Sequence, residues 1–164
     1  MNFLSAELWI LLLSILPISE IRGSMIYAFA EFAGEPAKLI TAYLLSVFGN
    51  FLPVPFVILA FRPLVKWLKT TKLFGRLATW LENRTTKKAG KLSTVSAIAL
   101  MVFVAIPFPT TGAWTGAMIA SLLDIRFKYA LPAILAGIIL SGLIVSLLLT
   151  GVLSLGALGE FMLS

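Results

Sequence analysis

Residues 16–23 read LPISEIRG and interrupt a long apolar run with a proline, a carboxylate and a guanidinium. A second interruption, at residues 106–116, reads IPFPTTGAWTG and contains two prolines. A charged side chain costs about 3 kcal/mol or more at the centre of a bilayer, and it usually marks a pathway or a ligand site. Irregular backbone is tolerated there only where protein or a water-filled cavity surrounds it. The two breaks together therefore predict one shared interior site, which is typical of a transporter.

The composition of the chain indicates an integral membrane protein. Hydrophobic residues make up 60% of its 164 residues, charged residues make up 12%, and the mean hydropathy is +1.03. This is too much apolar sequence for a soluble domain of this size. The length accommodates four to six crossings or hairpins, so we predict a single membrane domain over residues 1–164.

The residue types that the chain lacks exclude several kinds of chemistry. It contains no cysteine and no histidine, which excludes disulfides, thiolate catalysis, Cys/His zinc sites and histidine acid–base catalysis. Glu20 has no second carboxylate or nucleophile–base pair beside it, so we expect no enzyme activity, no metal and no cofactor. Residues 1–7 have no basic segment ahead of the first apolar run, and a cleaved signal peptide is not expected.

The positive charge is concentrated in one linker. Residues 62–91 contain nine Lys and Arg against Glu82 alone, a net charge of +8. Such clusters mark the cytoplasmic side of a membrane and attract anionic lipid headgroups. Apolar residues between Leu64 and Leu81 are consistent with a helix lying on the inner leaflet, and a solvated connector is the alternative. The position of the charge argues against nucleic-acid binding.

The apolar runs follow the order short, break, short, long, and this order occurs twice. The first repeat covers about residues 3–61 and the second about residues 92–155. Runs of 10 to 14 residues suit half-crossings, whereas about 20 residues are needed to span a bilayer. We therefore predict an all-α integral membrane fold, built as an inverted repeat of a re-entrant helical hairpin followed by a transmembrane helix, with an interfacial basic linker. The alternative is that each short pair crosses as one broken helix.

The charge distribution favours the hairpins over broken helices. Re-entrant hairpins place both termini and the acidic Glu31–Glu35 connection outside, while Arg126 and Lys128 join the basic linker inside. Broken helices would remove Arg126 and Lys128 from the basic side.

Glu20 and Arg22 are the strongest candidates for chemistry. Two residues apart, they would face different directions on a continuous helix, but they can converge in a non-helical tip. One alternative is a structural ion pair that pins the hairpin. In the functional alternative, Arg22 holds an anionic substrate and Glu20 exchanges protons, because burial favours the neutral carboxyl group and a nearby cation favours the carboxylate. Ser19 belongs to the same tip.

The second break supplies hydroxyl and backbone groups for the predicted pathway. Prolines remove amide donors and disfavour helix in the preceding residue, so half-helices beginning after each tip would aim their amides inward, which suits an anion. The alternative is that the hydroxyls satisfy backbone groups freed by the break. The candidate pathway residues of this break are Thr110, Thr111, Trp114 and Thr115. The residues expected to shape the two breaks are Pro17, Gly23, Pro107, Pro109, Gly112 and Gly116.

Two other features concern the long apolar segments. Pro53 and Pro55 predict a kink or a break in the first, where Asn50 could face a cavity or a neighbouring helix. The second contains small residues four apart, at Gly137 and Ser141 and at Gly142 and Ser146, and we expect them to allow close packing within the bundle rather than dimerisation.

The two breaks resemble the motifs of the small multidrug export protein family of bacteria and archaea. That family carries P-x-S-E-hydrophobic-R-G in the first motif and usually P-x-P-G-T-G-x-W-T-G in the second, and the resemblance extends over nearly the whole chain. This chain lacks the usual proline after Met25–Ile26 and has Thr110 where glycine is common. The family is distantly similar to DedA membrane proteins, a similarity that implies inverted repeats, proton-dependent drug tolerance and transport of polyprenyl phosphates or phospholipids.

These observations predict a transporter of the inner membrane, linked to protons, for an amphipathic or anionic lipid-like substrate or drug. Expected partners are that substrate, anionic lipids at the basic linker and a possible second copy of the chain. The alternatives are an uncoupled lipid scramblase and a structural membrane assembly protein.

Overall fold

A computed structural model describes the backbone of residues 3–69, 89–108 and 111–163 and the side chains of most of them. The described residues form helices and no strand. The helices are α1 (Phe3–Ile15), α2 (Glu20–Glu31), α3 (Pro36–Phe51), α4 (Val54–Lys69), α6 (Ala89–Ala105), α7 (Ala113–Leu122) and α8 (Phe127–Leu163). The prediction of an all-helical chain is confirmed.

The lengths of the helices follow the predicted order of short and long segments. Helices α1, α2, α6 and α7 have 13, 12, 17 and 10 residues, so at 1.5 Å per residue none reaches the thickness of about 30 Å that a bilayer core requires. Two apolar segments are long enough to cross, Pro36–Val65 with 30 residues and Phe127–Val152 with 26 residues. Each long segment follows a pair of short helices.

The first long segment is divided at the predicted proline. Helix α3 ends at Phe51 and α4 begins at Val54, with a turn at Leu52 and Pro53 between them. Proline has no amide hydrogen, and its ring disfavours helix in the preceding residue. The helical pattern resumes at once, since the Val57 amide donates to the Pro53 carbonyl at 2.9 Å. The sequence predicted a kink or a break at this position, and the structure shows a short break.

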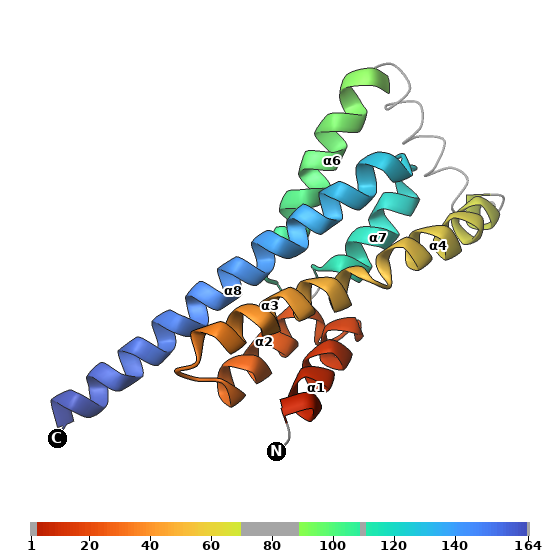
Figure 1. Ribbon diagram of the computed structural model, residues 1–164. Coiled ribbons are helices and arrows are strands. Elements are labelled where there is room, and N and C mark those ends of the chain that lie inside the picture. The colour runs from red at the N-terminus through yellow and green to blue at the C-terminus, as the bar shows by residue number, and fades with distance from the viewer. Residues whose placement is uncertain (1–2, 70–88, 109–110, 164) are drawn as a thin grey trace.

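The two short pairs approach each other from opposite ends of the molecule (Figure 1). The breaks that follow α1 and α6 meet in the middle. The connection from α2 to α3 lies at the same end as the C-terminus, and the end of α4, the start of α6 and the turn between α7 and α8 lie at the other. Helix α2 packs against α3 and α8, and α7 packs against α4 and α8. Each pair of short helices thus contacts the long segments of both halves.

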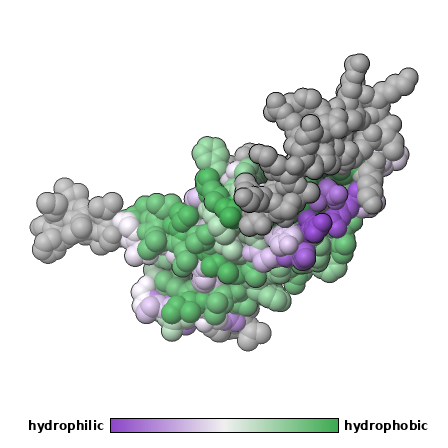
Figure 2. Space-filling model, turned by 90° about the horizontal axis from the view of Figure 1, so that it is seen from above, coloured by the Kyte–Doolittle hydropathy of each residue, from purple (hydrophilic) through white to green (hydrophobic). Residues whose placement is uncertain are grey.

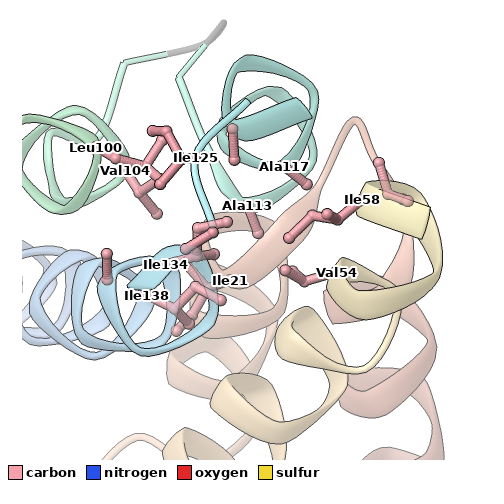
Figure 3. Packing of buried hydrophobic residues seen from close by; sticks show 14 of the residues in the cluster. Ile21, Val54, Ile58, Leu100, Val104, Ala113, Ala117, Ile125, Ile134 and Ile138 are labelled. Carbon is pink, nitrogen blue, oxygen red and sulfur yellow. The ribbon is translucent and has the colours of Figure 1, made fainter. Parts of the chain in front are cut away.

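Apolar side chains of α2, α4, α7 and α8 form the core where these helices converge (Figure 3). Ile21 of α2 lies near Val54 of α4 and near Ile134 and Ile138 of α8. Helix α7 contributes the fully buried Ala113, Ala117 and Ala120. Small side chains on this face let α7 approach α4 closely, because packing must come from van der Waals contact where lipid provides no hydrophobic drive.

The small residues of α8 serve packing inside the bundle, as predicted. A side chain at Gly137 would come within 2.7 Å of Val104 Cβ on α6, and one at Gly142 would come within 2.7 Å of both Ile21 Cδ1 and Tyr43 Cε2. The Tyr43 hydroxyl also donates a hydrogen bond to the Ile139 carbonyl at 2.8 Å, which joins α3 to α8.

The first basic residues of the predicted linker lie in α4, and one of them, Arg62, contacts the turn between α7 and α8. Helix α4 continues through Lys69 and α6 begins at Ala89, so helices include both ends of the predicted linker, residues 62–91. Residues 70–88, and with them most of the predicted interfacial helix, lie outside the described residues. The Arg62 guanidinium donates to the Ile125 carbonyl at 2.8 Å and lies 6.0 Å from the centroid of the Phe127 ring. Arg126 and Lys128 therefore lie at the same end as the basic end of α4.

Large apolar side chains also cover much of the outside of the bundle, as the green areas of Figure 2 show. Exposed ones on α3 and α4 include Leu44, Phe48, Phe56 and Leu59, and exposed ones on α8 include Leu143, Leu147 and Leu148. Soluble monomers rarely expose apolar patches of this extent. The outer surface is suited to lipid.

Candidate functional site: the junction of the two breaks

The first break places a carboxylate at the start of α2 in an unusual backbone conformation. The Glu20 amide donates to the Leu16 carbonyl at 2.9 Å, and Glu20 has a φ of 49°. A non-glycine residue in this left-handed region is strained by about 1 kcal/mol. The Ser19 hydroxyl donates to the Leu13 carbonyl, and a side chain at Gly23 would lie 2.5 Å from Ser19 Cβ. Ser19 and Gly23 therefore hold the shape of the turn that presents Glu20.

The Glu20 side chain crosses to the second break and lies at the N-terminus of α7. It is 6% exposed, and its Oε1 accepts a hydrogen bond from the Trp114 amide at 3.4 Å. Gly112, the N-cap of α7, has no side chain to serve as a cap. The carboxylate occupies the space of that missing side chain, because a Cβ atom at Gly112 would overlap it. Glu20 thus stabilises the positive end of the α7 dipole from another helix.

Arg22 also reaches the second break. Its two terminal nitrogens donate to the carbonyls of Phe108 and Thr111, while its Nε is buried and has no hydrogen-bond partner. Glu20 and Arg22 form no direct ion pair, unlike Lys38 and Glu35, whose charged groups lie 2.5 Å apart. The alternative of a self-neutralising pair is therefore not observed, since each charge bonds to a group about 90 residues away.

The Thr111 hydroxyl serves the backbone of its own break. It donates to the Ile106 carbonyl at 2.7 Å and accepts from the Phe108 amide at 3.2 Å. This is the structural role considered in the sequence analysis, because the hydroxyl satisfies groups that a continuous helix would have paired. Fixing the loop also fixes the two carbonyls that receive Arg22.

Trp114 joins the second break to the end of α1. Its indole N–H donates to the Ile15 carbonyl at 3.1 Å, which supports a packing role for this side chain. Thr115 lies half-buried in the first turn of α7, and a side chain at Gly116 would come within 2.5 Å of Val104 Cγ2. Pro17 is exposed and Pro107 is half-buried. Pro109 and Thr110 lie outside the described residues.

Several groups at this junction were not among the predicted site residues. The carbonyls of Leu13, Ile15 and Phe108 accept the side-chain hydrogen bonds described above. A backbone carbonyl has no signature in a sequence, so only the tertiary arrangement could reveal these acceptors.

Buried polar side chains continue into the bundle beyond the junction. Asn50 is 1% exposed and its Oδ1 has no hydrogen-bond partner, and the buried hydroxyls of Ser46 and Ser141 have none either. Asn50 and Ser46 are one turn apart on α3 and lie within 60° of Tyr43 at 100° per residue, on the side that contacts α8. Asn50 therefore faces the interior. In the described part of the chain, no group of three or more acidic residues could hold a metal ion.

A protein-family model matches residues 20–144, more than half of the chain, and the family is described as "Putative small multi-drug export protein". The chain belongs to this family. No curated protein and no solved structure matches it, so the predicted distant similarity to DedA proteins is not shown. The matched region begins at Glu20 and includes the whole second break, residues 106–116. Family membership and the apolar helices together place the protein in a membrane.

Proposed function

We propose that this protein is a proton-linked exporter of amphipathic, anionic or lipid-like compounds across the inner membrane. The observation that carries the proposal is the buried Glu20 carboxylate on the N-terminus of α7, with Arg22 bonded to the same break. A carboxylate and a guanidinium in an apolar bundle are costly, and in transporters such groups usually form the substrate and proton site.

The position of Glu20 suggests how a proton would be coupled to an anion. The carboxylate uses the amide end of α7, which is the part of the junction that favours a negative group. When Glu20 takes up a proton, its side chain becomes neutral. An anionic group of the substrate can then bind at the N-terminus of α7, next to Arg22. Loss of the substrate would restore the carboxylate and release the proton. Competition for one positive region would thus link the two events.

The inverted repeat is part of the same proposal. Gly23 and Gly116 are each the fourth residue of their helices, and both are too crowded for a side chain. Helix α2 packs on α8 of the second half and α7 packs on α4 of the first, and each also contacts the long segment of its own half. These relations support two hairpins that enter the bilayer from opposite sides and meet near its middle. The basic end would be cytoplasmic and would bind anionic lipids.

The decisive experiment is a transport assay in proteoliposomes with an imposed pH gradient and a fluorescent amphipathic anion as the probe. The Glu20→Gln variant should insert normally, because glutamine keeps the shape of the side chain. It should lose at least nine-tenths of the gradient-dependent flux, because glutamine cannot take up and release a proton. The control is Glu31→Gln, at an exposed carboxylate at the end of α2. Flux in Glu20→Gln with the pH dependence of the wild type would contradict proton coupling. Equal lipid flux in both directions without a gradient would instead identify a scramblase.

The proposed topology has its own test, which does not depend on the cargo. The chain contains no cysteine, so single substitutions report cleanly on their positions. A membrane-impermeant thiol reagent should label Glu35→Cys only from outside intact cells and Arg126→Cys only from the cytoplasmic side. Labelling of both positions from one side would contradict the re-entrant hairpins.

A further inference from the structure

The end of α3 lies halfway along a segment that is long enough to cross a bilayer. Asn50 is at the middle of Pro36–Val65, and the break at Leu52 and Pro53 follows it directly. Interrupted spanning helices provide ion sites near the middle of a membrane, because unwound carbonyls and the ends of half-helices become available there. The break in this segment therefore lies at the depth where such a site forms.

Two prolines leave carbonyl groups at the end of α3 without their helical donors. Pro53 has no amide hydrogen, so it cannot donate to the Gly49 carbonyl as the fourth residue along a helix would. Pro55 leaves the Phe51 carbonyl without a donor for the same reason. Within the described residues, no other backbone amide donates to these two carbonyls. The last carbonyls of a helix also carry the negative end of its dipole, which favours a cation.

Two buried side chains in the last turns of α3 have oxygens without partners. Asn50 is 1% exposed and Ser46 is 0% exposed, and neither Asn50 Oδ1 nor Ser46 Oγ has a hydrogen-bond partner. Hydroxyls of other helices donate to the carbonyl three or four residues before them, as those of Ser24, Ser121 and Ser146 do. The Ser46 hydroxyl makes no such bond. Buried oxygens without a partner in the protein indicate a bound water molecule or ion.

A third side-chain oxygen reaches the same turns of α3 from α1. A Cβ atom at Gly49 would overlap Ser14 Oγ, so the Ser14 hydroxyl lies directly against α3 at this glycine. The hydroxyl donates to the Leu11 carbonyl at 2.7 Å, and its oxygen keeps lone pairs for a further partner. Residues three or four apart on a helix have Cβ atoms about 5 to 6 Å apart. The oxygens of Ser14, Ser46 and Asn50 are therefore within reach of one small ligand.

We propose that the end of α3 binds an alkali-metal cation, with the Asn50 side chain as its central ligand. Ser14, Ser46 and the freed Gly49 carbonyl would supply further oxygens. Oxygen ligands are those that hard cations take, and protein sites for divalent cations usually include carboxylates. The proposed ligands are all neutral, which favours a monovalent ion. A water molecule alone is the competing occupant.

The proposed cation site adjoins the junction of the two breaks through the end of α1. Ser14 is next to Ile15, whose carbonyl accepts from the Trp114 indole, and the Trp114 amide donates to Glu20. Cation binding does not depend on the proposed export. The further step, that the bound cation takes part in transport together with the proton, rests on the proposed function.

Thermal unfolding of the purified protein in detergent tests cation binding without reference to transport. NaCl or KCl is titrated against choline chloride at constant ionic strength. A cation at about 100 times its dissociation constant should raise the melting temperature by about 5 to 10 °C relative to choline chloride. Asn50→Leu should abolish this rise and should melt no lower than the wild type in choline chloride, because it removes an oxygen without a partner.

Ser46→Ala provides a second test that keeps Asn50 in place. It should raise the salt concentration at half of the effect by about tenfold or more. The matched control is Ser121→Ala, at a hydroxyl that is 2% exposed and donates to the Ala117 carbonyl at 2.9 Å. This control should keep the response of the wild type to the alkali cation.

Two results would overturn the cation site. Equal melting temperatures of the wild type in NaCl, KCl and choline chloride would identify water as the occupant. A rise that both Asn50→Leu and Ser46→Ala keep in full would place any bound cation elsewhere. A rise that depends on Asn50 in a protein without pH-dependent transport would preserve the cation site and reject only the proposed function.

Discussion

Gly112→Ala tests whether the Glu20 carboxylate really occupies the N-terminus of α7. A Cβ atom at this position would overlap the carboxylate, so the side chain must leave its place beside the Trp114 amide. A hydrogen bond to a charged group contributes about 2 kcal/mol, and a carboxylate near a helix N-terminus contributes about 1 kcal/mol. The expected loss is therefore about 3 kcal/mol.

The measurement is thermal unfolding of the purified protein in detergent. A loss of this size should lower the melting temperature by about 6 to 12 °C for a chain of this length. The matched control is Gly151→Ala on α8, where a Cβ atom would meet nothing within 4 Å. This control should be neutral or should stabilise the protein by up to about 1 kcal/mol, the helix-propensity difference between the two residues.

A double-mutant cycle identifies the cause of the loss. If the overlap with Glu20 is responsible, Gly112→Ala should cost less than about 1 kcal/mol in a Glu20→Ala background, because no carboxylate remains to be displaced. An equal loss in both backgrounds would refute the assignment of Glu20 to this position. A Gly112→Ala protein as stable as the wild type would refute it as well.

Substitutions at four further positions have defined outcomes. Arg22→Lys should lower stability by about 1 to 2 kcal/mol, measured by thermal unfolding, because one ammonium group cannot donate to both carbonyls with the planar fork of arginine; unchanged stability would argue against the bridge. Thr111→Val should cost about 1 kcal/mol and Thr111→Ser much less, since serine keeps the hydroxyl that joins two backbone groups of the break; equal losses would mean that the methyl group matters instead. Asn50→Leu should leave the melting temperature unchanged or raise it, because it removes a buried oxygen without a partner; a marked fall would show that this oxygen is bonded in the membrane. Asp124→Gly should stabilise the protein slightly, by up to about 1 kcal/mol, since Asp124 has a φ of 50°; chemical denaturation can measure this change, and a loss would show that the carboxylate itself is needed.

Local patterns were sufficient to predict the helices. Hydropathy located the short and long segments, and the prolines located their ends, because both signals act on neighbouring residues through burial and backbone geometry. The break at Pro53 and the close packing at Gly137 and Gly142 were predicted on the same grounds. The basic linker over residues 62–91 stays a prediction, because α4 includes its first residues, through Lys69, and residues 70–88 lie outside the described residues.

The partners of the charged residues could not be predicted in the same way. Glu20 and Arg22 were predicted to lie near the second break, but two residues so close in sequence were also compatible with a direct ion pair. The structure separates them, because Glu20 bonds to an amide of α7 and Arg22 to carbonyls of the preceding loop. Those acceptors and donors belong to the backbone, and every residue carries the same backbone groups.

The sequence by itself determined that this chain is helical, apolar and twice interrupted, since hydrophobicity and proline act locally. The tertiary structure alone decided that Glu20 takes the place of a missing side chain at Gly112 and that Arg22 bridges Phe108 and Thr111. These contacts join positions about 90 residues apart, and they exist only because α2 and α7 begin at the same point of the bundle. The physical reason is that a sequence specifies which buried polar groups need hydrogen-bond partners. The packing of the helices specifies which groups become those partners.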